Sequence, residues 1–323
     1  MGFTAVMSPA GVVLGAHPAA IMGAIYSGAA FGDNLAPISD ITIVSAATQE
    51  AHVGGVVRSR LEYVLPAGVL SAVLFYIFGA EGGGVAPSQA QELPAATADP
   101  TGLPMLIPAA LVFNLAVSGG HFLAALTVGV LASMVVGPLF GIFSLGEVFR
   151  LEDGAVLGSA VDGALALLPI SILTLLLVTS IGIMAAGGFL ERLMEWLSRT
   201  MARTVRGAEG SIVGLITFTN ICVSVNTVAM ITAGPLANVP RKRHSLSKYR
   251  SANLMDTVCS FPYMLPYAAT IITANGIQQE LALRYDSVQV VPWSQEVVFI
   301  FYGMVFFPIM ILAVITGFGR RRG

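Results

Sequence analysis

The chain has 323 residues, of which 55% are hydrophobic and only 11% are charged, and its formal net charge at pH 7 is −2. Because an ordinary soluble domain carries about 25% charged residues, this composition excludes a soluble globular protein and offers no basic surface for nucleic acid. It predicts an all-α polytopic membrane protein. Cys222 and Cys259 both lie in apolar segments, which predicts buried small side chains and no disulfide.

Apolar runs recur along the chain, and a bilayer-spanning helix needs about 20 such residues. The first apolar region, residues 3–48, is interrupted by Gly32, Asn34 and Pro37. Uninterrupted spans are predicted at 62–80, 103–118, 121–143, 163–187, 252–274 and 295–318. A second interrupted region, 211–237, places polar side chains at membrane depth. Non-helical backbone is tolerated there only where protein or a water-filled cavity covers it.

The basic residues predict an orientation, because Lys and Arg collect in short cytoplasmic loops of membrane proteins. They fall in four segments that we expect to be cytoplasmic: 58–60, 192–206, 241–250 and 320–322. Only Arg150 and Arg284 lie elsewhere. Since basic segments flank 211–237 on both sides, we expect that region to enter and leave on one side, as a helical hairpin or re-entrant segment. The C-terminus is accordingly predicted to be cytoplasmic.

An internal repeat is predicted within a single transporter domain, residues 1–323. An interrupted apolar segment, a basic loop and a span occur in order at 18–48, 58–60 and 62–80, and again at 211–237, 241–250 and 252–274. Two broken segments in corresponding halves indicate a transport site near the membrane midplane. The expected parts are an incomplete first repeat half (1–80), an external flexible loop (81–102), connecting helices (103–187), a cytoplasmic amphipathic helix (188–206) and a second repeat half (207–318).

Two carboxylates, Asp33 and Asp40, stand in the apolar stretch that begins at Gly23. A charged side chain at the bilayer centre costs roughly 2.5–3.5 kcal/mol, so both are expected to serve a function. Pro37 lacks the amide hydrogen of a continuous helix, which predicts an unwound stretch with the aspartates at its edges. Because a carboxylate in low dielectric takes up a proton more readily than one in water, a proton and a small cation such as sodium would compete there.

Neutral oxygen ligands are expected around these aspartates. In the first broken segment they are Asn34, Ser39 and Thr42, together with freed backbone carbonyls. In the second broken segment the polar residues are Thr219, Asn220, Ser224, Asn226 and Thr227. Hydrogen bonds between helices are an alternative role for this second group. Ser39 or Asp40 has an alternative role too, as the N-cap of a helix that resumes at Ile41.

Asp256 is a third candidate carboxylate, beside Thr257 and Ser260 in another apolar stretch. It is expected either to join the site as a carboxylate or proton carrier, or to pair with a basic side chain near the cytoplasmic boundary. The four histidines, His17, His52, His121 and His244, have no ligand spacing and predict structural roles. No cofactor or resident metal is expected beyond the transported sodium and proton.

The segment GAIYSGAAFGDNLAPISDITIVSAA resembles the signature of the NhaC-type sodium/proton antiporter family, in the ion-transporter superfamily. QEAHVGGVVRSRLEYVLPAGVLSAVLFY resembles that family's next loop and helix, SANLMDTVCSFPYMLPYAA its second signature block, and VVPWSQEVVFIFYGMVFFPIMILAVITG its closing helix. In the second block, Met255-Asp256 and Pro266-Tyr267 stand where family members commonly have Glu-Asp and Pro-Trp. The resemblance implies inverted repeats and alternating access. Family members are usually longer at the amino end, so this chain is expected to lack the helices that precede the first broken segment in the family.

The resemblance further implies that Asp33 and Asp40 handle cation and proton, with Asp256 as a weaker member. Together with the composition, it predicts a secondary transporter and not an enzyme, which exchanges sodium for protons across a prokaryotic inner membrane. The expected partners are the lipid bilayer, small cations and a second copy of the chain.

Two alternatives remain at the level of the sequence. A sodium- and proton-coupled exchanger of organic anions such as malate and lactate would need a cation for the substrate carboxylate, and no Lys or Arg is expected at membrane depth. The amino end of the half-helix after Pro37 would have to substitute. An intramembrane aspartyl protease is more remote, because it would require Asp33 and the Tyr285-Asp286 dipeptide in one site.

Overall fold

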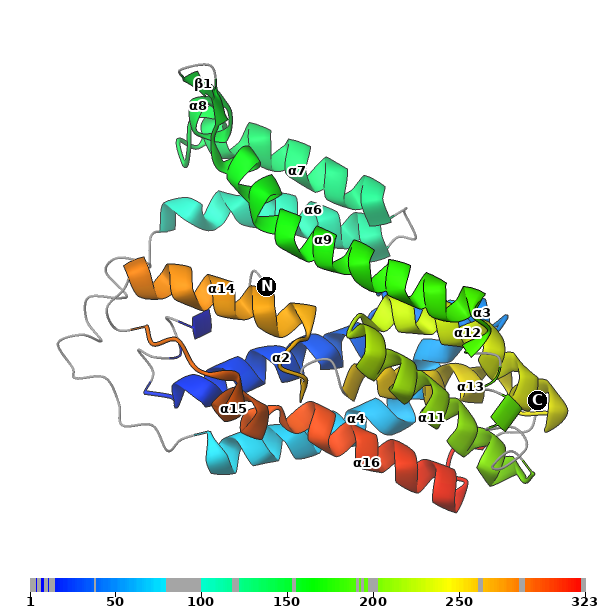
Figure 1. Cartoon of the computed structure of the whole chain (residues 1–323). Helices are drawn as coiled ribbons and strands as arrows, with labels where there is room; N and C mark the ends of the chain where they lie inside the picture. Colours follow the sequence, from blue (N-terminus) through cyan, green and yellow to red (C-terminus); the bar gives the residue numbers. More distant parts are fainter. Residues whose placement is uncertain are drawn as a thin grey trace. The chain divides into compact units, whose positions relative to one another are not determined.

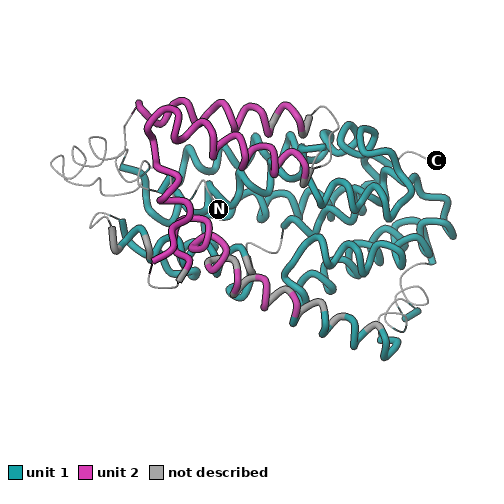
Figure 2. The backbone as a smooth tube through the Cα atoms, turned by 90° about the horizontal axis from the view of Figure 1, so that it is seen from above, with its two compact units in different colours: residues 1–94, 176–323 teal, residues 95–175 magenta. Residues whose placement is uncertain are grey.

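The computed structural model describes residues 15–37, 39–79, 100–117, 122–152, 155–189, 203–260, 264–284 and 288–320, with a few isolated positions near residues 4–11 and 192–196. The chain divides into two compact units, one formed by residues 1–94 and 176–323 and the other by residues 95–175 (Figure 2). The predicted external loop 81–102 and the predicted amphipathic helix 188–206 lie largely outside the described residues, as does Tyr285-Asp286.

The first unit begins with a broken helix and a long continuous one (Figure 1). Helix α2 covers Pro18–Leu35, α3 covers Asp40–Thr48, and α4 covers Val53–Phe78. His17 caps α2 by accepting the N–H of Ala19 at 3.1 Å, and Pro18 stands at the first helical position, where its missing donor is not needed. The interruption predicted around Pro37 is confirmed, since residues 36–39 separate α2 from α3.

The second interrupted region forms two helices, α11 (Val205–Val223) and α12 (Asn226–Arg243). Between them Ser224 has a φ of +54°, in the left-handed region where a helix stops. The two helices pack against each other (Figure 1), so that the segment is a helical hairpin with its tip at Ser224. The hairpin agrees with the prediction for 211–237, and its path relative to a membrane stays a prediction.

The uninterrupted span predicted at 252–274 is wrong. Helix α13 (Lys248–Met255) is followed by a short 3-10 helix, η2 (Asp256–Ser260), and α14 begins only at Ala269 (Ala269–Arg284). Pro262 and Pro266 follow η2 in the sequence and lack the amide hydrogens that a continuing helix would use. The break places Asp256 at a discontinuity. It also makes this part of the proposed repeat unlike α4, which is continuous.

The C-terminal apolar segment is bent. Helix α15 (Trp293–Glu296) and the 3-10 helix η4 (Val297–Phe299) meet helix α16 (Phe301–Thr316) at an angle of 53°, so the predicted single span at 295–318 changes direction at Ile300. Among the described residues, α4 is by length and composition the one helix that could cross a membrane by itself, and this bent pair would be a second span.

The second unit contains η1 (Pro100–Met105), α6 (Leu106–Val117), α7 (Phe122–Leu139), α8 (Leu145–Val148) and a two-stranded antiparallel sheet, β1 (Arg150–Glu152) with β2 (Ala155–Leu157). Helix α9 (Ser159–Ala186) continues from it into the first unit. Helices α6, α7 and α9 lie at the spans predicted at 103–118, 121–143 and 163–187. The small sheet was not predicted; Arg150 is paired with Leu157 across it.

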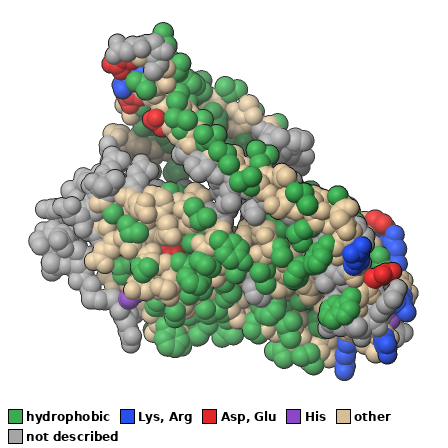
Figure 3. All heavy atoms as spheres, viewed as in Figure 1, with side chains coloured by type: hydrophobic (Ala, Val, Ile, Leu, Met, Phe, Trp, Pro, Cys, Tyr) green, Lys and Arg blue, Asp and Glu red, His purple; other side chains and the backbone are tan. Residues whose placement is uncertain are grey.

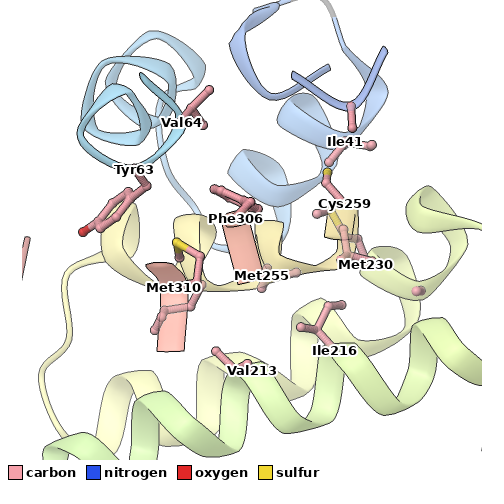
Figure 4. Packing of buried hydrophobic residues seen from close by; sticks show 14 of the residues in the cluster. Ile41, Tyr63, Val64, Val213, Ile216, Met230, Met255, Cys259, Phe306 and Met310 are labelled. Atoms are coloured by element: carbon pink, nitrogen blue, oxygen red, sulfur yellow. The ribbon is translucent and has the colours of Figure 1, made fainter. Parts of the chain in front are cut away.

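The hydrophobic core of the first unit is built from α2, α3, α4, α11, α12, α13, η2 and α16. Figure 4 shows Ile41, Tyr63, Met255 and Phe306 packed together from four of these elements. Cys259 is buried in this core, as predicted, but Cys222 is exposed, so the prediction is wrong for Cys222. The physical reason is helical periodicity, because α11 buries its neighbouring positions Thr219, Asn220 and Val223 and turns position 222 outward.

The basic segments gather at one end of the first unit, where Figure 3 shows most Lys and Arg side chains together. Glu50 contacts two lysines of the segment 241–250: its carboxylate accepts a hydrogen bond from Lys242 at 3.2 Å and its backbone carbonyl accepts one from Lys248 at 3.0 Å. The hydrogen bond and charge of Lys242 lower the pKa of Glu50, which keeps this link ionised at neutral pH. This clustering agrees with the predicted orientation, while the cytoplasmic assignment of this end stays a prediction.

Gly303 allows α16 to approach η2 closely. A Cβ atom at this position would lie 2.6 Å from the carbonyl oxygen of Ser260. Gly303→Ala is therefore expected to displace η2 and to lower the free energy of unfolding by about 1–3 kcal/mol, measured as a fall in the thermal unfolding midpoint in detergent. Gly214→Ala is the control, because a Cβ there meets no atom within 4 Å; equal midpoints for the two variants would contradict the prediction.

Candidate functional site

The break between α2 and α3 sets the two predicted aspartates apart as expected. Asp33 is half-buried in the last turn of α2, and Asp40 is the exposed first residue of α3. One carboxylate oxygen of Asp40 accepts the N–H of Ile41 at 2.9 Å, in the first turn, where a negative charge is favoured. Ser39 occupies the N-cap position but makes no capping hydrogen bond through its side chain. The charges of Asp33 and Asp40 repel each other.

Arg60 is the central residue that sequence reasoning misplaced. It was predicted to lie in a cytoplasmic loop with Arg58, but α4 begins at Val53 and carries Arg60 into the core, where it is fully buried. A periodic signal existed, because the buried residues of α4 include Val56, Arg60, Val64 and Ala67, which share one helical face. The rule that basic residues mark loops outweighed that signal.

The guanidinium of Arg60 donates hydrogen bonds to polar groups around the break between α2 and α3. One terminal nitrogen donates to the carbonyl of Asn34 at 3.3 Å and to the hydroxyl of Thr42 at 2.8 Å, and the other donates to the hydroxyl of Ser45 at 3.1 Å. Thr42 in turn donates to the carbonyl of Asp33 at 3.3 Å. Two of the freed carbonyls that we predicted as cation ligands, those of Asp33 and Asn34, are thus already hydrogen-bonded.

Asp256 pairs with Arg60 and not with a residue at the cytoplasmic boundary. Its Oδ2 lies 2.7 Å from Nε of Arg60, and both side chains have no exposed surface. The contact is an ion pair without a hydrogen bond. Asp256 also interacts electrostatically with Asp33. Asp256 therefore has a basic partner that lies beside the break carrying Asp33, and its role as a site carboxylate or proton carrier stays a prediction.

The tip of the α11–α12 hairpin meets the same region. Thr227 donates a short hydrogen bond to Asp40, and the amide nitrogen of Asn220 donates to the carbonyl of Val258 in η2 at 3.0 Å. Helix α12 packs on α3, and η2 contacts α2, α3, α11 and α12. Three discontinuities distant in sequence therefore converge, as the prediction of a site between two broken segments requires.

Within the described residues, several buried oxygen atoms at these discontinuities have no hydrogen-bond partner. They are Oδ1 of Asn34, Oγ of Ser39, Oδ1 of Asn220, Oγ of Ser224, Oδ1 of Asn226 and Oγ of Ser260. Leaving such an atom unsatisfied costs about 1–3 kcal/mol, and neutral oxygens of this kind are ligands for hard cations. Thr219 differs, because its hydroxyl donates to the carbonyl of Leu215 at 2.9 Å within α11.

Carboxylates alone do not form a metal cluster here. No three of the His, Cys, Asp and Glu side chains that the structure describes come together closely enough to hold a metal ion. A cation at this site would consequently be held by neutral oxygens together with one or two aspartates, which favours weak, exchangeable binding over a resident metal.

Tyr302 is a further residue that the sequence did not indicate. It is buried in α16, and its hydroxyl accepts a hydrogen bond from the amide nitrogen of Asn34 at 2.7 Å. Its ring stacks on Phe306, with ring centroids 5.4 Å apart. Tyr302 thereby fixes the Asn34 side chain, and the unpartnered oxygen of that amide is left available.

Residues 3–80 match the sequence profile of the Na+/H+ antiporter family. The predicted resemblance to the NhaC-type family is confirmed. The matched segment contains Asp33, Asp40 and the buried Arg60. The family and the relatives that the chain resembles are membrane transporters.

Three curated relatives share parts of the sequence. The "Malate-2H(+)/Na(+)-lactate antiporter" of Bacillus subtilis (strain 168) is 42% identical over 64 residues, which is 20% of this chain and 14% of that protein. The "Na(+)/H(+) antiporter NhaC" of the same strain is 28% identical over 138 residues, 41% of this chain and 30% of that protein. An uncharacterized Na(+)/H(+) antiporter of Haemophilus influenzae is 37% identical over 71 residues, 21% of this chain and 15% of that protein.

Each match spans less than a third of the relative's own length. No solved structure matches the chain. The family profile covers the helices α2, α3 and α4, and the α11–α12 hairpin and η2 lie outside the residues that it matches.

Proposed function

We propose that this protein is a secondary transporter that exchanges sodium for protons across a bacterial cell membrane by alternating access. The observation that carries the proposal is the convergence of Asp33 and Asp40 with unpartnered buried oxygens where the α2–α3 break, the hairpin tip and η2 meet. Discontinuous helices of this kind supply both side-chain and backbone oxygens to ions at membrane depth.

The charge of the site favours a cation. Asp33, Asp40 and Asp256 are negative when ionised, and Arg60 is the basic side chain that pairs with one of them. The remaining two carboxylates repel each other across the break. A proton or a sodium ion relieves this repulsion in the same way, so the two compete for Asp33 and Asp40, and this competition couples their movements in opposite directions.

Arg60 has a positioning role in this scheme. By pairing with Asp256 it leaves Asp33 and Asp40 as the groups that exchange their ligands. Its bonds to Asn34 and Thr42 hold the end of α2 against the start of α3. Because Arg60 is always protonated, it gives the site a fixed positive charge that no change of pH in the physiological range removes.

Exchange of organic anions is the second candidate, because one relative bears the name of a malate and lactate antiporter. The sequence predicted no Lys or Arg at membrane depth, but Arg60 is buried in the first unit. However, its donors are engaged by Asp256, Asn34, Thr42 and Ser45, so an organic carboxylate would have to displace Asp256. The geometry favours the cation as cargo.

The decisive experiment uses liposomes that contain the purified protein and an internal pH dye. Addition of sodium, lithium or potassium outside is expected to drive proton flux, and Asp33→Asn or Asp40→Asn is expected to reduce that flux on the order of 100-fold, since each removes a proton-binding group. Asp162→Asn is the control, because Asp162 is exposed at the start of α9.

Other outcomes overturn the proposal. Flux that appears only with malate or lactate present would move the assignment to the anion exchanger. Wild-type protein without cation-dependent flux, or aspartate variants with wild-type flux, would exclude sodium/proton exchange at these residues.

A further inference from the structure

Outside the candidate site lies another buried carboxylate, which differs from Glu209 in its partners. Glu296, in α15, has no exposed surface. One of its oxygens accepts a hydrogen bond from the amide nitrogen of Gln278 at 2.6 Å, and the other accepts one from the hydroxyl of Tyr26 at 3.3 Å. Within the described part of the chain, no basic side chain forms an ion pair with Glu296.

These contacts allow Glu296 to exist in two protonation states. Gln278 is oriented by the backbone N–H of Val291, which donates to its carbonyl oxygen at 2.9 Å, so its amide nitrogen is directed at Glu296. Two donors stabilise the carboxylate. The absence of a positive partner in a buried place favours the neutral acid. A carboxyl group in such balanced surroundings is suited to take up and release a proton.

The position of Glu296 connects it to the candidate site. It lies on the segment that bends by 53° before α16, and it contacts α2 through Tyr26. Tyr26 and Asp33 are seven residues apart on α2, so they lie on the same face of that helix, about 10 Å apart along its axis.

Polar side chains bridge α2 and α16 between these two points. The hydroxyl of Ser27 accepts the N–H of Tyr302 at 3.3 Å, and the Tyr302 hydroxyl accepts a hydrogen bond from Asn34. This row of polar groups on a helix–helix contact is unusual in an otherwise apolar core. The described bonds are separate pairs, which place polar groups at intervals along α2 from Tyr26 to Asn34, next to Asp33.

We propose that Glu296 is a second proton-binding residue, which exchanges protons with Asp33 along the contact between α2 and α16; this rests on the proposed sodium/proton exchange. When sodium leaves Asp33, the O–H bond of protonated Glu296 breaks and one on Asp33 forms, and Glu296 is then recharged from the adjoining aqueous side. The titratable side chains near Glu296 on the α2 side are Tyr26 and His17, and the His17 ring stacks on Phe299. On the α14 side, the contact of Glu296 is the neutral amide of Gln278.

The test compares Glu296→Gln with wild type in the same liposomes, in two assays. Sodium-driven proton flux is expected to fall on the order of 100-fold. Exchange of labelled sodium for sodium, which moves no net proton, is expected to stay within about twofold of wild type, because the sodium site is intact. His17→Gln is the matched control for titration near the same segment, and it is expected to keep the wild-type dependence of flux on pH.

The outcomes separate this inference from the proposed function. Wild-type protein without sodium-driven proton flux contradicts the proposed function itself. Active wild type together with unchanged proton flux in Glu296→Gln overturns the role of Glu296 alone. Loss of both fluxes in Glu296→Gln that Glu296→Asp fails to restore would show that Glu296 is required for the fold and would equally overturn the proposal.

Discussion

Arg60→Met is expected to lower the free energy of unfolding by about 3–5 kcal/mol, because it leaves Asp256 as a buried charge without a partner. The ion pair has an N to O separation of 2.7 Å, and neither side chain is exposed. Methionine keeps a long apolar side chain, so the loss of packing is small compared with the loss of charge. Denaturant-induced unfolding in detergent, followed by circular dichroism, measures this effect.

The double variant Arg60→Met with Asp256→Asn tests whether the unpaired charge of Asp256 causes the loss of stability. Removal of both charges eliminates the uncompensated carboxylate, so at least half of the lost stability is expected to return. Arg58→Met is the matched control, since Arg58 lies two residues before Arg60 in α4 and is exposed. If the double variant is less stable than Arg60→Met alone, the ion pair does not dominate the energetics of this site.

Glu209→Gln is expected to have an effect of similar size at the other end of the first unit. Glu209 is fully buried and binds two arginines: Arg250 at 2.9 Å and, through the C-terminal segment, Arg320 at 2.6 Å. Arg250 also donates to the hydroxyl of Tyr63 and to the carbonyl of Ala313. Loss of the negative charge leaves Arg250 buried without a counter-ion, which costs about 3–5 kcal/mol.

The control for Glu209 is an exposed ion pair of the same type. Glu152 lies 3.3 Å from Arg150, and both side chains are 59% exposed. Glu152→Gln is therefore expected to change stability by less than about 1 kcal/mol, because water screens such pairs. The unfolding midpoints of the two variants are compared under identical conditions, and equal shifts would show that burial of Glu209 contributes nothing.

Local chemistry made the breaks of the chain predictable. Pro37 cannot donate the backbone hydrogen bond that a helix needs, and α2 does end before it. The polar run from Thr219 to Thr227 cannot face lipid, and the structure turns it into the tip of a hairpin. The two prolines after Asp256 also indicate a break in the helix. The apolar composition around them nevertheless led to the wrong prediction of a continuous span.

Charged residues were harder to place, because their positions depend on partners far away in the sequence. Because arginine tends to lie in loops, we predicted Arg60 at the surface. Its partner Asp256 is distant in the sequence, so no local pattern indicates the pair. Glu296 was missed for the same reason, since its donors Tyr26 and Gln278 come from other helices.

The sequence by itself predicted the helical class, the breaks at Pro37 and within 211–237, the resemblance to the antiporter family and two candidate aspartates in the first broken segment, because these follow from apolar composition, proline chemistry and a contiguous signature. Only the tertiary structure decided which carboxylate pairs with Arg60, which oxygens lack partners and where the buried Glu296 lies. Those properties are set by the convergence of segments distant in sequence, and the energy of a buried charge depends on what surrounds it in space.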